Sequence, residues 1–472
     1  MNRSAQRRGI LRATIAVAAS RVIGFPLALA VNMVLARVLT REEYAFFGVL
    51  ASFSLLFALF AQAGFQTSVV RMLGEAEAGD DSLDKPSIFY GAVLATLGFG
   101  SVLAVAFFFA GRGFLPDIGG AQGWLFLLAA VLLLVRSLNT VTAQALRGIG
   151  KVGASANLSG HGDQGGLIRC VLLLAGFGFA IATGTLTLAT AIWVSIGASA
   201  ICALWAALLV LRHTGARFAP RKVLRTMTSR NEDNFNMMVS EALFYWVSVS
   251  AAIVIGGALV DATAMAGMVA AFQLRNILTS PMTMIAGAVP NILIGLHRAG
   301  DTEELERVLR GTASAAFVIC AAASLLLLAL GPGGLRMIFG PEYSDAYYHL
   351  VLISPGILYF IYCGLAGQSL LWLGSTQVHR SVMVKVLVIT TPLYFALAHF
   401  FGAYGLSAGL VISILLQNTM MLHAARRTLG VWSHAYLDPR EYLKAWRMLR
   451  GVLAERRRTG QGQGQGQGES DA

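Results

Sequence analysis

Apolar residues in this chain gather into runs long enough to cross a lipid bilayer, and short polar segments separate them. A spanning helix needs about 20 mostly apolar residues. The pattern predicts twelve spans, at 13–36, 45–64, 88–110, 124–145, 165–183, 187–211, 236–259, 263–294, 313–331, 349–373, 381–400 and 402–424. The eighth contains Pro281 and Pro290, so we expect it to bend or to end early. The last two spans are divided only at Phe401 and Gly402.

The longest polar segment inside the chain divides the twelve spans into two sets of six. We therefore expect an N-terminal lobe at 1–211, a basic cytoplasmic linker at 212–235, a C-terminal lobe at 236–425 and a basic cytoplasmic tail at 426–472 with a disordered Gly-Gln end. The second and eighth spans share a weak echo, in which Gly48 and Gly267 align at an offset of 219 residues. Two repeated halves with a substrate site between them are typical of transporters.

Composition supports a chain made mostly of spans. Hydrophobic residues make up 56% of it and charged residues only 13%, with a mean hydropathy of +0.67, whereas average globular domains are about 25% charged. Long continuous apolar runs disfavour a β-barrel, whose strands alternate. The start of the chain imitates a signal peptide, but its apolar stretch continues to Ala36 and contains Arg21, which favours a first spanning helix. The fold class expected is an all-α polytopic membrane protein.

Lysine and arginine are distributed unevenly between the two sides of the predicted bundle. With the N-terminus in the cytoplasm, 27 of the 36 lie in cytoplasmic segments, four in external loops and five within spans. Positive charge favours cytoplasmic loops, so the bias predicts an even number of spans with both termini in the cytoplasm. The net charge of +12 is then explained by these segments, and nucleic acid is not an expected partner. The basic tail helix is expected either to lie on the anionic inner leaflet or to be solvated.

Charged residues within the spans are the main functional signal, because an ionised group in hydrocarbon is costly and usually faces a cavity or a partner. The five cations of this kind are Arg21, Arg136, Arg169, Arg275 and Lys385. Asn32 shares a helical face with Arg21, and Asn139 continues a polar seam that begins at Arg136. Arg169 and Lys385 lie near the ends of their spans, so extension to the cytoplasmic interface is an equal alternative to lining a substrate path.

Few carboxylates oppose these cations. Glu241 is the only acid clearly within a span, and Asp163 borders the fifth. The imbalance predicts a cationic lumen and an anionic substrate, since arginine binds phosphate oxygens bidentately and stays protonated. Glu241 has two interpretations that the sequence leaves open: it neutralises an arginine, or it binds a coupling ion, H⁺ or Na⁺.

Several chemistries are disfavoured by what the sequence lacks. It has no GxxxxGK[ST] phosphate-binding loop, no HExxH, and no metal-type spacing among its four cysteines, which all lie in apolar runs. External loops of at most about 17 residues leave no room for a catalytic domain. We therefore expect a transporter rather than an enzyme, with no cofactor and no metal.

Three stretches resemble one family. "LARVLTREEYAFFGVLASFSLLFALFAQAGFQTSVVR" is similar to the first hairpin of polysaccharide-type lipid-linked oligosaccharide flippases, with Thr40 where members often have glycine. "MAGMVAAFQLRNILTSPMTMIAGAVPNIL" resembles their eighth span, and "IFGPEYSDAYYHLVLISPGILYF" the segment that enters their tenth. The resemblance covers most of residues 10–430, and the basic Gly-Gln tail departs from it.

The resemblance implies two six-helix lobes in a V, alternating access and a central cationic cavity. It places the family's first-span and eighth-span arginines on Arg21 and Arg275, as ligands of a substrate pyrophosphate. The implied substrate is a polyprenyl-pyrophosphate-linked oligosaccharide for cell-surface polysaccharide synthesis, flipped across a bacterial inner membrane. Membrane lipids, a polymerase and glycosyltransferases are the implied partners.

Three alternatives stay open at the level of sequence. A cation-coupled multidrug extruder of the same superfamily would prefer acids in its lumen, and the first span has none. A membrane glycosyltransferase or polymerase would need a large external loop or an acidic cluster. A scaffold for a polysaccharide synthesis complex would tolerate the loss of the arginines.

Overall fold

A computed structural model describes residues 23–77, 83–114, 123–159, 166–228 and 231–436, and the described residues are helices joined by turns and short connections. The first described helix is Ile23–Val38. The helices that follow in the N-terminal lobe are α2 (Arg41–Ala61), α3 (Phe65–Glu77), α4 (Lys85–Phe114), α5 (Gly123–Gly148), α6 (Val152–Leu158), α7 (Leu167–Ala182) and α8 (Leu188–Thr214). A short helix, α9 (Pro220–Thr228), lies in the linker between the lobes.

The C-terminal lobe begins with a span that changes its helical pitch. A π-helical turn, η1 (Trp246–Ser250), separates α10 (Asn231–Tyr245) from α11 (Ala251–Leu259). The remaining elements are α12 (Ala262–Leu278), α13 (Ser280–Ala288), α14 (Pro290–Ala299), α15 (Thr302–Ala329), α16 (Gly331–Phe339), the 3₁₀ turn η2 (Pro341–Tyr343), α17 (Ala346–Cys363), α18 (Ala366–Trp372) and α19 (Thr376–Leu429).

The breaks predicted within the spans are present. The eighth span is divided into α12, α13 and α14, with Pro281 and Pro290 in the first turns of the second and third pieces. The stretch labelled α19 covers both of the last two spans, which are two helices joined by a kink at Gly402, where φ is +56°. Among the described residues seven helices are long and apolar enough to span a bilayer, or eight if the bent α10–α11 pair is counted. The double span in α19, the divided eighth span and two shorter apolar helices make this consistent with twelve spans.

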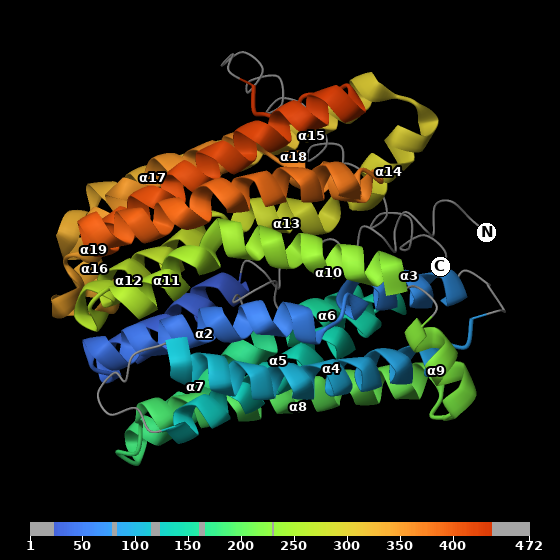
Figure 1. Cartoon of the computed structure of the whole chain (residues 1–472), viewed down its shortest axis with the longest axis horizontal. Helices are drawn as coiled ribbons and strands as arrows, with labels where there is room; N and C mark the ends of the chain where they lie inside the picture. The colour runs from blue at the N-terminus through green and yellow to red at the C-terminus, as the bar shows by residue number, and fades with distance from the viewer. Residues whose placement is uncertain (1–22, 78–82, 115–122, 160–165, 229–230, 437–472) are drawn as a thin grey trace, which may run out of the picture.

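The two lobes lie side by side with their helices roughly along the longest axis of the molecule (Figure 1). Helices α2 and α3 form the N-terminal side of the boundary and pack against α10, α11 and α12. We name the end of the bundle that carries α9 and α14 the basic end, and the end that carries α16 and the first turn of α2 the opposite end. The lobe boundaries proposed from the sequence stay predictions.

Local sequence explains how α2 begins at the opposite end. Thr40 is its N-cap, and the side chains of Thr40 and Glu43 bond reciprocally to each other's backbone N–H groups. A threonine at this position therefore satisfies helix donors that a glycine would leave to water. The turn between the first two spans is fixed by this cap.

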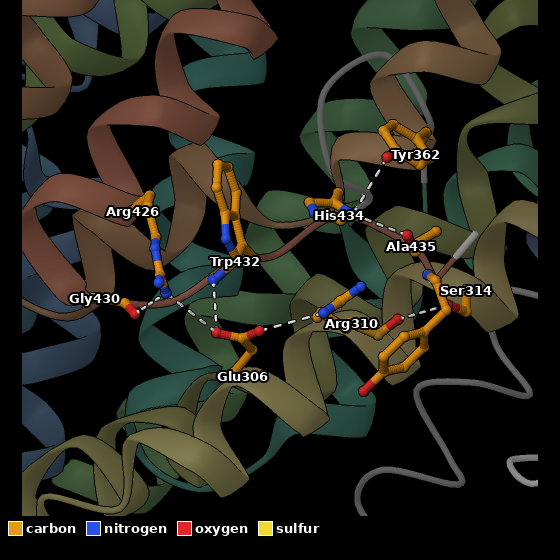
Figure 2. Close-up of polar contacts among 10 residues, drawn as sticks. Glu306, Arg310, Ser314, Tyr362, Arg426, Gly430, Trp432, His434 and Ala435 are labelled. Atoms are coloured by element: carbon orange, nitrogen blue, oxygen red, sulfur yellow. Dashed lines mark hydrogen bonds and ion pairs between the residues drawn. The ribbon is translucent and has the colours of Figure 1, made fainter. Parts of the chain in front are cut away.

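A short segment after α19, which we name the strap (residues 430–436), ties the C-terminal lobe together at the basic end (Figure 2). The Glu306 carboxylate on α15 accepts a hydrogen bond from the Trp432 backbone N–H at 3.1 Å and pairs with Arg310 at 3.3 Å. Further along, the Tyr436 N–H donates to Ser314 Oγ at 2.8 Å. The strap therefore holds the end of α19 against α15.

Gly64 lies between α2 and α3, and its surroundings leave no space for a side chain. It has φ +77°, and a Cβ added there would lie 2.2 Å from the backbone carbonyl oxygen of Asn234, at the start of the other lobe. We expect Gly64→Ala to lower the melting temperature of the purified protein, since the backbone strain alone costs about 1–3 kcal/mol and the carbonyl must also be displaced.

Gly150→Ala is the matched control for that measurement. Gly150 has nearly the same φ, +78°, but a Cβ there would meet no atom within 4 Å. The two variants share the cost of the left-handed backbone, so the difference between their melting temperatures reports the contact between the lobes. Equal losses in both variants would show that this contact is not tight.

Candidate functional site

A cavity lies against the boundary between the lobes, mostly on the N-terminal side. It encloses about 70 Å³, and residues from the first described helix, α2, α5, α7, α8 and α12 line it. Its lining residues are Ala28, Val31, Asn32, Leu35, Tyr44, Phe47, Gly48, Ala51, Leu132, Arg136, Arg169, Cys170, Leu173, Phe177, Ser195, Val269 and Gln273. Since α12 belongs to the C-terminal lobe, relative motion of the lobes would change the shape of the cavity.

Two arginines bring positive charge to this cavity from different helices. Arg136 comes from the middle of α5, and Arg169 from the first turn of α7. Arg169 is only 9% exposed, and its Nε donates to Ser199 Oγ on α8 at 3.2 Å. That hydrogen bond fixes the guanidinium by one edge, so its orientation is set before any ligand arrives.

The remaining polar groups of the lining are neutral. Asn32 and Gln273 carry amide donors, whereas the Ser195 hydroxyl already donates to the Ala191 carbonyl at 2.8 Å; none of the described lining residues is an aspartate or glutamate. Asn32 already donates its amide to the Ala28 carbonyl at 2.9 Å. A partly enclosed cavity whose described lining holds two guanidinium groups and no carboxylate suits an anion whose oxygens accept several charge-assisted hydrogen bonds.

Three of the residues predicted to bind substrate therefore meet in one place: Asn32, Arg136 and Arg169. Arg21 lies outside the described residues. Asn139 is 4% exposed and donates to the Leu158 carbonyl at 3.4 Å, so it faces α6 rather than the cavity. The polar seam on α5 thus divides between the cavity and the interior of its own lobe.

Two other predicted cations lie elsewhere. Arg275 is 7% exposed, donates to Asn276 Oδ1 at 3.4 Å, and has no hydrogen-bond partner for Nε in the described part of the chain. Lys385 is exposed on α19 beside exposed Val384 and Val388, on a face that a bilayer would cover. That position favours extension of Lys385 to the membrane interface over a place in the cavity. A substrate contact at Arg275 stays a prediction.

The side chain of Glu241 joins the two lobes on the side of the bundle toward the basic end. Its carboxylate on α10 accepts a hydrogen bond from the Thr67 hydroxyl on α3 at 3.2 Å. No ion pair joins it to an arginine within the described ranges, and Arg21 is not among them. Its roles as a charge partner or an ion site stay predictions, while its contact with the other lobe is an observation.

The opposite end of the bundle is closed by Arg41, the first residue of α2. Its guanidinium pairs with Asp345 at 2.5 Å and donates to the Glu342 carbonyl at 2.6 Å and the Thr263 carbonyl at 3.1 Å. The same group lies 5.4 Å from the centre of the Tyr343 ring. All four partners belong to the C-terminal lobe, so one side chain joins the lobes through three elements. We name this arrangement the Arg41 latch.

Close helix packing continues the contact from the latch toward the cavity. A Cβ on Gly48 of α2 would lie 2.5 Å from Val269 Cγ1 on α12, and one on Gly257 of α11 would lie 2.5 Å from Val49 Cγ1. Small residues allow helix backbones to approach closely in a membrane. Together with Gly64 and Glu241, these contacts join the lobes at both ends of the bundle in this conformation.

Sequence reasoning missed several residues of the site. Gln273 is an amide in the eighth span, two residues before the predicted Arg275, and this polar side chain was a usable signal. Ser195 and Ser199 are isolated serines in an apolar helix and carried no signal beyond ordinary helix packing. Arg41 and Asp345 are loop-proximal charges in different halves of the chain, and nothing in the sequence pairs them.

Comparisons with known proteins give the fold and a family match. A family model described as polysaccharide biosynthesis protein matches residues 10–292, and no curated protein matches the sequence. An inward-facing multidrug resistance MATE family transporter of the MOP superfamily is 15% identical, with a TM-score of 0.63 over 88% of this chain and 98% of that one. The lipid II flippase MurJ, in an inward closed conformation, is 12% identical, with a TM-score of 0.66 over 88% of this chain and 87% of that one.

A third solved structure is a MOP superfamily transporter from Pyrococcus furiosus, 14% identical, with a TM-score of 0.58 over 89% of this chain and 95% of that one. At these identities the likenesses show the fold alone. The predicted all-helical polytopic fold is confirmed, and it is the fold of the MOP superfamily.

Proposed function

Because the chain belongs to the polysaccharide biosynthesis protein family, we propose that it is an alternating-access flippase for an anionic polyprenyl-pyrophosphate-linked oligosaccharide. The family and the fold are those of a transporter rather than of an enzyme. The observation that carries the proposal is that Arg136 and Arg169 both line one cavity, and that no carboxylate is among the described residues of its lining.

The cavity supplies what a pyrophosphate needs to leave water. Moving such a headgroup through bare hydrocarbon would cost tens of kcal/mol on a Born estimate. Guanidinium groups from α5 and α7 replace part of its hydration, and Asn32 and Gln273 add neutral donors from the two lobes. The polyprenyl chain stays in the bilayer while the headgroup passes between the lobes.

Direction follows from the proposed orientation. We place the basic end in the cytoplasm of a bacterial cell, with both termini there and the protein in the inner membrane. Outward movement of about two negative charges then gains roughly 4.6 kcal/mol per 100 mV of inside-negative potential. This term drives export without a coupling ion, and H⁺ or Na⁺ at Glu241 would be a second source. A polymerase would consume the flipped lipid on the outer side.

Alternating access requires the two sets of lobe contacts to break in turn. Opening to the cytoplasm separates Gly64 and Thr67 of the N-terminal lobe from Asn234 and Glu241 of the C-terminal lobe. Opening to the outside breaks the Arg41 latch. A bound anion that attracts both lobes would favour the state in which both ends are closed, and the headgroup in that state can leave by either side.

Ligand-induced stabilisation of the purified protein tests the proposal against the multidrug extruder. We expect a short-chain polyprenyl pyrophosphate to raise the melting temperature, because a ligand that binds only the folded state at 100 times its Kd adds about 2.7 kcal/mol. The uncharged polyprenol of the same length is the matched control and should have a smaller effect. Stabilisation by the cationic dye ethidium, with none by the pyrophosphate, would replace the flippase by the extruder.

A transport assay completes the test. Proteoliposomes that carry a fluorescent polyprenyl-pyrophosphate sugar in both leaflets are treated with a membrane-impermeant quencher, and the fraction quenched over time reports flipping. An inside-negative potential should accelerate outward flipping if charge moves with the substrate. The same rate with and without the protein would refute the proposed activity.

A further inference from the structure

The linker helix α9 lies across the basic end of the N-terminal lobe rather than along its spans. In Figure 1 it runs across the direction of α4 and α8 at the basic end. Val223 is 3% exposed and packs against the first turns of α4, where a Cβ on Gly91 would lie 3.4 Å from its carbonyl oxygen. Helix α9 is therefore an in-plane helix at the level where α4 enters the bilayer.

An ion pair and an aromatic contact fix α9 in that position. Lys222 Nζ lies 3.3 Å from Asp84 Oδ1, in the turn before α4. The Phe218 ring packs edge-on against Tyr90 with 5.3 Å between ring centres. Hydrogen bonds from Ser87 and Lys222 lower the pKa of the Asp84 carboxyl below its usual value, so the ion pair is present at neutral pH. The ion pair holds the face of α9 that lies toward α4, and the edge of the Phe218 ring holds the segment just before the helix.

The other face of α9 is both apolar and basic. Leu224 on α9 is 63% exposed. Phe218 precedes the helix and touches Tyr90 with one edge of its ring, yet 56% of it is still exposed. Arg217 and Arg221 are exposed beside them. The segment from Arg212 to Thr228 holds five lysines and arginines and no acid. Apolar side chains among exposed cations, on a helix parallel to the membrane plane, match an anionic lipid surface and not open solvent.

We propose that α9 binds the inner leaflet through anionic phospholipid headgroups, with Phe218 and Leu224 inserted between the lipids and Arg217 and Arg221 on their phosphates. The site is separate from the cavity, so it stands whether or not the flippase substrate is right; it rests on the cytoplasmic placement of the basic end. Each arginine held at a headgroup strengthens the lipid contact by about fivefold. Because α9 precedes α10, lipid binding here anchors the connection about which the lobes move.

Depth-dependent fluorescence quenching tests this inference on the full chain. Leu224→Cys carries an apolar bimane label in place of the leucine, and the four native cysteines are buried and do not compete. The protein is reconstituted in phosphatidylcholine vesicles, with or without phosphatidylglycerol, that contain a lipid quencher near the headgroup. We expect quenching by the lipid to rise several-fold with phosphatidylglycerol, and aqueous iodide to quench less.

Charge variants distinguish headgroup binding from simple apolar contact. R217Q/R221Q should abolish the phosphatidylglycerol effect, whereas R427Q, which removes an exposed cation at the end of α19, should leave it intact. Lipid quenching that ignores phosphatidylglycerol, or that survives R217Q/R221Q, overturns the inference. So does a label that iodide reaches equally in both lipids, which would indicate a soluble partner for this face.

Discussion

Replacing Arg136 or Arg169 by alanine is expected to stop export and to leave lipid-linked oligosaccharide on the inner leaflet. Both guanidinium groups line the cavity. Removing one partner of a buried pair of opposite charges, here an arginine and the substrate pyrophosphate, typically costs about 2–5 kcal/mol of binding free energy, or at least a thirtyfold loss of affinity. The measurement is the accumulation of lipid-linked oligosaccharide in a strain whose only copy of the gene carries the variant, at matched protein levels. Binding of the polyprenyl pyrophosphate by the purified variant gives the affinity directly.

Lys385→Ala is the matched control, because it also removes a cation from within a predicted span. Lys385 is exposed on the outer face of α19 and does not line the cavity, so export should continue. Arg169→Lys separates charge from geometry: a lysine keeps the positive charge but cannot hold Ser199 and a phosphate at once in the planar arrangement of arginine. Normal export by both alanine variants would remove the arginine pair from the mechanism and favour the scaffold alternative.

The same pair of residues shows what the sequence could and could not predict about the site. Arg169 and Lys385 are equivalent in sequence, since each lies about one turn inside an apolar span. The structure separates them because Arg169 meets Ser199 on α8, whereas the neighbours of Lys385 are exposed valines. Which side of a span faces another helix depends on the rotation of that helix in the bundle, and hydropathy alone does not encode it.

More of the fold than of the site could be predicted from the sequence. Spans such as α4, α5 and α8 follow from continuous apolar runs, and the breaks at Pro281, Pro290 and Gly402 follow from backbone chemistry. Helices outside the apolar runs were missed: α3 continues to Glu77, well past the predicted end of the second span at 64. Its polar surface belongs to a segment packed against α4 and α5, where tertiary contacts and not hydropathy decide the structure.

The repeat suggested by Gly48 and Gly267 has a structural counterpart in close packing. Gly48 admits Val269 from the other lobe, and a Cβ on Gly267 would lie 2.6 Å from Asp345 Oδ2 of the Arg41 latch. Both glycines thus lie where a larger residue would push apart elements that must approach closely. The chain also breaks at Gly64, between α2 and α3 at the predicted end of the second span, and at Thr279 within the eighth span. These positions are where each half of the chain can bend.

Arg41→Ala is expected to shift the conformational equilibrium toward a state that is open at the opposite end of the bundle, the end that carries α16 and the first turn of α2. Its guanidinium makes an ion pair and two backbone hydrogen bonds to the C-terminal lobe while its side chain is only 20% exposed. We therefore expect these contacts to stabilise the closed end by more than the 0–1 kcal/mol of an ordinary surface ion pair. A loss of about 1.4 kcal/mol would raise the open-to-closed ratio about tenfold. Spin labels on exposed Leu127 and Tyr348, one on each lobe, measure the distance distribution across that end.

A double-mutant cycle shows whether the latch acts as one unit. Asp345→Ala should produce much of the same shift, and the double variant should add little to Arg41→Ala, because residues in one network are not additive. Arg336→Ala removes another exposed cation at the same end, one with no ion pair among the described residues, and should leave the distances unchanged. Strict additivity of the two latch variants, or an unaltered distance distribution in Arg41→Ala, would mean that helix packing around Gly48 and Gly257 keeps this end closed without the latch.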